Sequence, residues 1–249
     1  MRTVLLVVVA AGALAGILYV AWKLQAEPPL PPPKSEVPIL MYHSISEGQD
    51  LKVPPNDFDA QMKWLADHGY TPVTMQSLQL YWQGKLDIPG QPIVITFDDG
   101  YLDNYTAAYP ILQKYHFPAT IYVITDSVKL GNHMKWPQMQ KMHAHGIEFG
   151  SHTVHHTNFK RTNPDQLKSE LAESKRALEK GLGSSVTTFC YPGGGLIPDA
   201  AQLVREAGYE TAVTTRNAWA TMSEDRLLLS RVRVVGGISI EQFAKQLRR

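Results

Sequence analysis

The chain has 249 residues, 44% of them hydrophobic, which is enough for one large core or two small ones. Its 24 Lys and Arg nearly balance 23 Asp and Glu, so the charge shows no electrostatic preference for nucleic acid. The single cysteine excludes an intrachain disulfide but does not exclude an oxidising compartment.

The amino-terminal segment is typical of a membrane span. No residue from Thr3 to Trp22 is charged, and such a segment at a rise of ~1.5 Å per residue extends roughly 30 Å, the thickness of a bilayer's hydrocarbon core. A positive Arg2 favours a start on the inside. We therefore expect residues 1–26 to be an uncleaved anchor in the cell membrane. The alternative is a cleaved signal peptide, because Ala13-Leu14-Ala15 offers an A-x-A cleavage site.

The rest of the chain is expected outside the membrane, in a periplasmic or extracellular position. Residues 27–36 are rich in proline and predict a stiff, extended linker. Residues 37–249 are expected to form one folded domain.

Strands and helices should alternate along this domain. We expect strands at 37–42, 70–73, 93–97, 119–124, from 147, 186–191, 209–214 and 227–235, and helices at 57–68, 75–82, 104–115, 137–145, 163–180, 198–207 and from 239. Capping signals support three helix ends: Asn56 or Asp57, Gly181, and Ser239 with Gln242. Repeated β-α units indicate an α/β fold with a parallel sheet, either a barrel or an open doubly wound sheet.

The most informative stretch, residues 93–100, reads I-V-I-T-F-D-D-G. The apolar run predicts a strand buried on both faces. Two carboxylates at its end would be costly to bury without charged partners or a metal. Adjacent strand residues point to opposite faces, so Asp98 and Asp99 should reach different partners unless the chain turns. A surface D-D-G turn is the alternative.

A second stretch, residues 147–156, reads I-E-F-G-S-H-T-V-H-H. His152 and His156 are four residues apart, so one helical turn would place both imidazoles on one side, where they could share a metal. Imidazole and carboxylate are ordinary zinc ligands, and catalytic zinc keeps an open position. The alternative is a histidine-rich surface that also includes His133, His143, His145 and His155.

A barrel is favoured over an open sheet because the polar groups all follow predicted strands. His43, Asp98-Asp99, His152 with His156, and the turn after Tyr191 each stand at a carboxyl end. A β/α barrel gathers those ends around one mouth, where its active sites are built. Neither G-x-G-x-x-G after a strand nor G-x-x-x-x-G-K is present, so nucleotide binding is not expected.

With these residues the chain resembles the polysaccharide deacetylase family, the carbohydrate esterases that share the NodB homology domain. T-F-D-D-G at 96–100 is similar to the family's first motif, and H-T-V-H-H at 152–156 fits its H-[ST]-x-x-H motif. The resemblance covers roughly residues 37–249. It implies a distorted (β/α) barrel of about seven strands, one divalent metal, usually zinc, and removal of N-acetyl groups from a sugar polymer.

The resemblance also implies a role for each matching residue. Asp98 corresponds to the general base, and Asp99, His152 and His156 correspond to the metal ligands. The third motif, here residues 189–195, would supply an oxyanion donor at Gly193, with Tyr191 beside it. The family places an aromatic residue near the acetyl group or sugar where this chain has Trp219, although a Trp after a strand is as often plain packing.

Two departures from the family pattern stand out. Most members carry an Arg in the third motif that orients the base, and this chain has Cys190 there, so that the partner is missing or comes from elsewhere, for example Arg231 or Arg233. The usual closing L-x-H, which supplies a catalytic acid, is absent. In both departures the chain resembles a subgroup of the family, the biofilm poly-N-acetylglucosamine deacetylases. Members of that subgroup look circularly permuted and carry M-Y-H near the start of the domain, as this chain does at Met41 to His43. We therefore expect His43 to be the catalytic acid.

Two other classes of function compete with a deacetylase. Two histidines and one carboxylate also form the metal triad of non-haem iron oxygenases, although the alternating β-α pattern opposes that fold. A non-catalytic glycan-binding protein could retain the cleft, but it would not need Asp98. Cys190 is a weak nucleophile candidate, because no histidine stands near it in sequence. Residue types alone do not choose among a biofilm glucosamine polymer, peptidoglycan, chitin-like oligomers and xylan.

Overall fold

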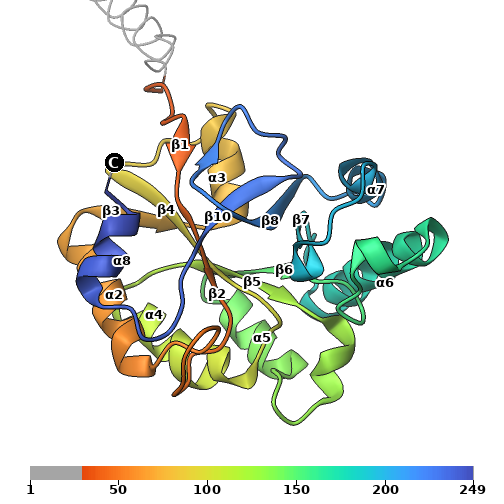
Figure 1. Ribbon diagram of the computed structural model, residues 1–249, viewed down its shortest axis with the longest axis horizontal. Helices are drawn as coiled ribbons and strands as arrows, with labels where there is room; N and C mark the ends of the chain where they lie inside the picture. Colours follow the sequence, from red (N-terminus) through yellow and green to blue (C-terminus); the bar gives the residue numbers. More distant parts are fainter. Residues whose placement is uncertain (1–29, 249) are drawn as a thin grey trace, which may run out of the picture. The chain divides into compact units, whose positions relative to one another are not determined.

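The computed structural model describes residues 30–248, and its main compact unit begins at Pro32 (Figure 1). The strands are β1 (Glu36–Val37), β2 (Ile39–Tyr42), β3 (Tyr70–Val73), β4 (Gln91–Phe97), β5 (Ala119–Val123), β6 (Ile147–Ser151), β7 (Thr188–Cys190), β8 (Thr211–Asn217), β9 (Ala220–Thr221) and β10 (Leu229–Arg233). The α-helices are α2 (Pro55–Asp67), α3 (Met75–Trp82), α4 (Tyr109–Lys114), α5 (Trp136–His143), α6 (Pro164–Leu182), α7 (Ala200–Glu206) and α8 (Ile240–Gln246).

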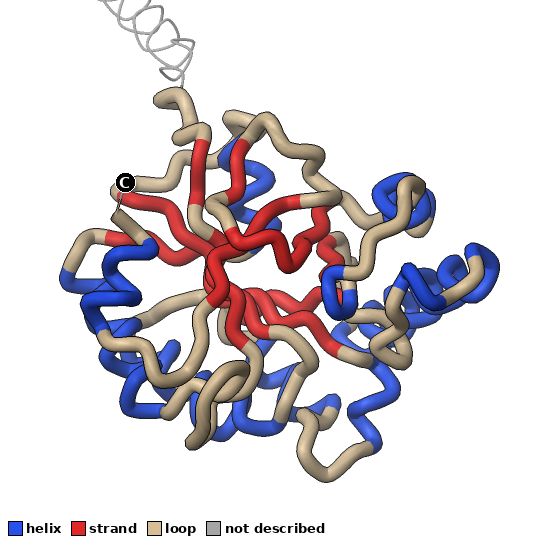
Figure 2. The backbone as a smooth tube through the Cα atoms, viewed as in Figure 1, coloured by secondary structure: helices blue, strands red, loops and turns tan. Residues whose placement is uncertain are grey.

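Seven parallel strands close into a barrel in the order β2, β10, β8, β7, β6, β5 and β4, and β4 pairs again with β2. The strands gather in the middle of the molecule and the helices surround them (Figure 2). This confirms the prediction of a barrel over an open sheet. The first and last barrel strands are neighbours, because Val232 and Arg233 of β10 pair with Leu40 and Met41 of β2.

The barrel is distorted around β4. Residues 91–94 of this strand pair with β3, whereas Thr96 and Phe97 pair with β5. β2 pairs with residues 94–97 of β4. Because Val94 pairs with both β2 and β3, these two strands lie on opposite edges of β4. β3 is therefore an additional strand outside the closed ring, and β5 takes its place toward the mouth.

Side-chain alternation divides the buried residues into two groups. Ile93, Ile95 and Phe97 belong to the hydrophobic cluster that includes α2, α4 and α6, whereas Val94 belongs to a second cluster with residues of α3, β8 and β10. Neighbouring residues of a strand face opposite sides, so Val94, Thr96 and Asp98 point to the inside of the barrel. This alternation carries the first carboxylate into the barrel interior.

Several predicted helix ends need correction. Helix α2 begins at Pro55 without a side-chain cap, because Pro at the first turn needs no N–H partner. Helix α6 continues past Gly181 and ends at Gly183, which has the left-handed φ of 71° that a cap requires. The predicted capping box of Ser239 and Gln242 is confirmed. Residues 104–114 form a π-helical turn followed by α4, with Pro110 at the start of α4.

The predicted membrane segment, residues 3–22, lies outside the described residues. Within residues 30–248, we find no helix that combines the length and the apolar character needed to cross a bilayer. Residues just before β1 already contact the domain, because Lys34 N donates to Tyr81 Oη at 2.8 Å and Trp82 Nε1 donates to Lys34 O at 3.0 Å.

Candidate active site

The two carboxylates stand where β4 leaves the sheet at the barrel mouth. Asp98 N still donates to Tyr42 O at 2.9 Å, so Asp98 continues the strand. The chain then turns sharply, because Asp99 and Gly100 both have left-handed φ angles of 72° and 78°. A side chain at Gly100 would also lie 3.3 Å from Val123 Cγ2, so a glycine suits this turn. Asp98 and Asp99 have different partners even though the chain turns here, which was the exception named in the prediction from strand alternation.

Asp98 is buried and held by Arg231 of β10. Each carboxylate oxygen accepts one hydrogen bond, Oδ1 from Nη1 at 2.7 Å and Oδ2 from Nη2 at 2.8 Å. The guanidinium group has five N–H donors, and the other three reach Thr214 O at 2.9 Å, Thr96 Oγ1 at 3.1 Å and Cys190 Sγ at 3.3 Å. Arg231 is fully buried, with all five donors paired.

This arrangement shows where the missing partner of the base comes from. Arg231 faces Asp98, whereas Arg233 is the last residue of β10 and is exposed. Burial by itself raises the pKa of Asp98, but the charge and hydrogen bonds of Arg231 hold that pKa well below its usual range. The small Cys190 leaves the space that the guanidinium group occupies.

Asp99 lies beside both histidines of the second motif. Its Oδ1 is 3.5 Å from His152 Nε2 and 3.6 Å from His156 Nε2. The ligand atoms of these three residues lie within 4.8 Å of one another, so one ion could contact all three. His152 Nδ1 bonds to Cys190 O at 2.7 Å, which leaves Nε2 facing Asp99. Such a second contact is what orients metal-ligating histidines.

The ionisation of these side chains also suits a divalent metal. Burial lowers the pKa of His152 to about 4 and lowers that of His156, so both imidazoles are neutral at pH 7. Burial, followed by the charge of Asp98, raises the pKa of Asp99 to about 6, which leaves mostly carboxylate at neutral pH. Neutral imidazoles and carboxylate are the forms that bind metal, so the donor set fits the implied ion.

The loop that carries the two histidines is not helical. Residues 152–156 form an irregular turn in which Thr153 and His156 have left-handed φ angles of 66° and 59°. The expected single helical turn is therefore wrong, although the two imidazoles do meet, with ring centroids 4.9 Å apart. The imidazoles meet in a loop with left-handed backbone conformations at Thr153 and His156.

The other histidines of the suggested histidine-rich surface have separate partners. His155 Nδ1 contacts Glu170 Oε1 at 2.7 Å, and His143 bonds to Ile147 O and Ser184 Oγ. His145 Nδ1 bonds to Lys141 O, and the His133 ring packs on Tyr101. Only His152 and His156 meet Asp99 in the described part of the chain.

His43 follows β2 and lies beside Asp98. Its Nε2 is 3.7 Å from Asp98 Oδ2, and its side chain is 15% exposed. Its Nδ1 is buried and has no hydrogen-bond partner among residues 30–248. The closure of β2 on β4 and β10 thus brings His43 next to the carboxylate, where the expected proton donor must stand.

The third motif gives a mixed result. Gly193 is exposed, with a φ of 58°, and no protein acceptor is found for its N–H in the described chain. Tyr191 is fully buried and packs against Phe159 and Phe189, with ring centroids 5.2 and 5.1 Å away. Its N–H donates to Val213 O within the sheet. Tyr191 therefore contributes to the core, and the expected contact with substrate does not fit its position.

Trp219 lies away from the mouth. After β8 the chain turns back, so that β9 pairs antiparallel with β1, and Trp219 Nε1 donates to Gln246 O at 3.0 Å. Its side chain lines a cavity with Trp64, His68, Tyr70, Gln91, Leu247 and Arg248. Tyr70 and Gln91 begin β3 and β4, at the end opposite Asp98. The expected contact between Trp219 and the acetyl group or sugar is corrected to packing.

One contact of the site was not predicted from the sequence. The Tyr101 hydroxyl donates to Asp99, and its ring packs on His133 with centroids 4.9 Å apart. Burial and the charge of Asp99 raise the pKa of Tyr101 to about 12, so the hydroxyl remains a donor. Tyr101 stands two residues after Asp99, but proximity in sequence alone did not show that its hydroxyl reaches this carboxylate.

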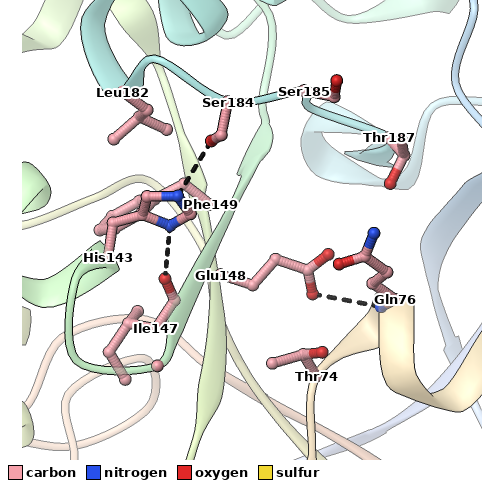
Figure 3. A pocket seen from close by; sticks show the side chains of 11 residues that line it. Thr74, Gln76, His143, Ile147, Glu148, Phe149, Leu182, Ser184, Ser185 and Thr187 are labelled. Carbon is pink, nitrogen blue, oxygen red and sulfur yellow. Dashed lines mark hydrogen bonds between the residues drawn. The ribbon is translucent and has the colours of Figure 1, made fainter.

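A cavity of about 300 Å³ lies at the other end of the barrel (Figure 3). Its lining includes Ile147 and Glu148, which begin β6, whereas Ser151 ends that strand beside His152. The Glu148 carboxylate accepts hydrogen bonds from the N–H groups of Met75 and Gln76 at the start of α3. A carboxylate there stabilises the helix terminus, so this cavity belongs to the structural end of the barrel.

Comparisons with known proteins agree with this geometry. The family model described as polysaccharide deacetylase matches residues 85–212. The protein YxkH of Bacillus subtilis (strain 168), which is named for the same family, is 39% identical over 209 residues, covering 84% of this chain and 75% of that protein. This chain belongs to the polysaccharide deacetylase family.

Two further relatives of this deacetylase are informative. The poly-beta-1,6-N-acetyl-D-glucosamine N-deacetylase of Staphylococcus aureus (strain MRSA252) is 27% identical over 208 residues, covering 78% of this chain and 71% of that protein. The solved structure of the Streptococcus pyogenes deacetylase PplD in complex with acetate matches with a TM-score of 0.81 and 30% identity, covering 86% of this chain and 99% of that one. The protein is thus an enzyme of carbohydrate deacetylation, and the iron oxygenase interpretation has no support.

Proposed function

We propose that this deacetylase is metal-dependent and removes N-acetyl groups from a polysaccharide that contains N-acetylglucosamine. The observation that carries the proposal is that Asp98 lies 3.7 Å from His43 and is followed directly by Asp99, which forms a cluster with His152 and His156. The similarity to the Staphylococcus aureus enzyme supports the choice of polymer. Zinc is the ion we propose, because two imidazoles and one carboxylate with an open position are typical of catalytic zinc.

The metal would be held by Asp99, His152 and His156, and when bound it supplies Lewis-acid polarisation of the amide carbonyl. Asp98 accepts the proton of the attacking water, because Arg231 keeps this carboxyl deprotonated. The N–H of Gly193 is the proposed donor to the developing oxyanion, because no protein acceptor binds it in the described chain.

His43 donates a proton to the leaving nitrogen. The amide C–N bond breaks, acetate leaves with the oxygen of water, and the sugar keeps a free amine. Because His43 Nε2 lies 3.7 Å from Asp98 Oδ2, a proton taken up by the carboxylate has a short path to the imidazole. The two groups can therefore act together as an acid and base pair.

The cellular arrangement that we propose follows from the sequence. Residues 1–26 would anchor the protein in the cell membrane, or serve as a cleaved signal, and residues 27–36 would separate that segment from the catalytic domain. The polysaccharide would then be met outside the cytoplasm. A uniformly apolar stretch from Thr3 to Trp22 supports this proposal.

The proposal is tested by acetate release from a panel of polymers. Purified protein loaded with zinc is incubated with poly-β-1,6-N-acetylglucosamine, peptidoglycan, chitin oligomers and acetylated xylan, and free acetate is measured. We expect release from one or more of the N-acetylglucosamine polymers and none after chelation of the metal. Release from acetylated xylan alone would contradict the proposed substrate.

A non-catalytic glycan-binding protein is the remaining alternative. Such a protein would bind a polymer of the panel without releasing acetate from any of them. The intact pair of Asp98 and Arg231 opposes this interpretation, because a binding module has no use for a buried ionised base.

A further inference from the structure

Glu170 of α6 reaches under the loop that carries the two histidines. Its Oε2 accepts hydrogen bonds from Val154 N at 2.8 Å and from His155 N at 3.1 Å, and its Oε1 contacts His155 Nδ1 at 2.7 Å. Only 5% of Glu170 is exposed. One buried carboxylate thus binds the two residues in the middle of the H-T-V-H-H motif, and none of its contacts is with the candidate ligands themselves.

The contacts of Glu170 hold the part of the loop whose backbone conformation is least favourable by itself. Thr153 and His156 flank the two bound residues, and both have left-handed φ angles. Such conformations are unfavourable for residues other than glycine and persist only where the surroundings enforce them. Without Glu170, the Val154 and His155 amides would lose their hydrogen-bond acceptor in a partly buried loop, which is unfavourable for each group.

We propose that Glu170 is a positioning residue, which holds the loop in the shape that presents His152 and His156 to the metal before the metal arrives. This inference rests on the proposed metal centre and adds a residue to it. Partners of this kind, one contact removed from the ion, typically change metal affinity by about 10–100-fold when they are replaced.

Glutamate suits this position because it accepts hydrogen bonds with both oxygens. In Glu170→Gln, the side chain loses its negative charge and one of its two acceptor oxygens, so the hydrogen bonds to Val154 and His155 lose the extra strength that a charged acceptor gives. The side-chain volume barely changes, so the substitution tests the hydrogen bonds and not the packing. Glu173 lies on the exposed side of α6, and Glu173→Gln is the matched control for the loss of one negative charge.

The experiment measures zinc affinity, not only turnover. Metal-free full-length protein, Glu170→Gln and Glu173→Gln are titrated with Zn²⁺ at a temperature where thermal melting shows each to be folded. We expect Glu170→Gln to bind Zn²⁺ about 10–100-fold more weakly, and Glu173→Gln to bind it as the wild type does. A lower melting temperature with unchanged affinity would mean a purely structural role and would overturn the proposal.

Hydrogen exchange in the metal-free wild type gives a test that needs no variant. If Glu170 pre-forms the loop, the amide hydrogens of Val154 and His155 exchange slowly before any metal is added. Rapid exchange at both amides would refute the proposal even if Glu170→Gln failed to fold. A wild type that binds Zn²⁺ but releases no acetate would reject the proposed function and leave the role of Glu170 intact.

Discussion

Arg231 of the last barrel strand binds both carboxylate oxygens of Asp98, at 2.7 and 2.8 Å, across 133 residues of sequence. The family usually has an Arg in its third motif, and this chain has Cys190 there. The guanidinium group enters from β10 instead, and the cysteine accepts one of its hydrogen bonds. The pairing of β10 with β2 and β8 makes this approach possible.

Removal of Arg231 should affect both stability and the pH profile. Arg231→Met leaves a buried carboxylate without its counter-charge, which costs about 3–5 kcal/mol in such pairs. Urea unfolding at pH 7 measures this loss. Arg233→Met, at the exposed end of the same strand, is the control and should change the free energy of unfolding by about 0.5 kcal/mol or less. Equal stability of the two variants would contradict the central role of the ion pair.

The same substitution predicts a shift in pH dependence with a definite sign. The pKa of Asp98 is lowered in the folded protein, so the ion pair contributes stability above the unfolded carboxyl pKa of about 3.9. That contribution is lost as pH falls through the lowered folded pKa. In Arg231→Met the pKa of Asp98 rises, so the acid limb of the turnover profile should move to higher pH. An unchanged acid limb would show that Asp98 does not control it.

Loss of any one of the three candidate metal ligands should lower both metal binding and activity. Asp99→Ala, His152→Ala and His156→Ala each remove one of three protein ligands, so each should lower metal content and deacetylation in parallel. Metal is measured by mass spectrometry after gel filtration. His155→Ala is the control and should retain metal, because its side chain faces Glu170. Loss of metal in His155→Ala with full metal in His156→Ala would reverse the assignment.

Asp98→Asn should separate metal binding from catalysis. It removes a general base, which is worth about 10²–10⁴ in rate, while Asp99, His152 and His156 remain. It also leaves Arg231 without a counter-charge, so turnover is compared only on protein shown to be folded and metal-loaded. Turnover close to that of the wild type under those conditions would disprove the role as base.

His43→Ala should keep metal binding and fold but lose most turnover. The imidazole is the group beside Asp98 that can protonate the leaving amine, and it does not belong to the cluster of candidate metal ligands. The basic limb of the pH profile should disappear with it. The measurement is acetate release from an N-acetylated polymer between pH 5 and 10, and near-normal rates would rule out His43 as the acid.

Removal of residues 1–26 should yield a soluble and active protein. The compact unit begins at Pro32, and its first strand begins at Glu36. Lys34, which contacts α3, is retained. Solubility without detergent and acetate release are the two measurements. A native protein that begins at Gly16 would show instead that the segment is a cleaved signal.

Local sequence was sufficient to locate most strands and helices and the segments that carry the candidate metal ligands. Tyr70–Val73 and Met75–Trp82 have the predicted bounds, because hydrophobic periodicity and capping act over a few residues. The segments that carry Asp98-Asp99 and His152 with His156 were found because chemistry at a barrel mouth follows strand ends, and strand ends are visible in a single segment. The choice of Asp99, His152 and His156 as ligands came from the resemblance to the family.

Contacts between distant segments could be decided only by the tertiary structure. The choice of Arg231 over Arg233, the burial of Tyr191, and the position of Trp219 at the far end of the barrel all depend on register and on which strands are neighbours. The same is true of Glu170, which looks like any other acidic residue of an amphipathic helix until α6 packs beneath the loop. A pattern along the chain shows which face a residue occupies, whereas closure of the barrel determines what that face meets.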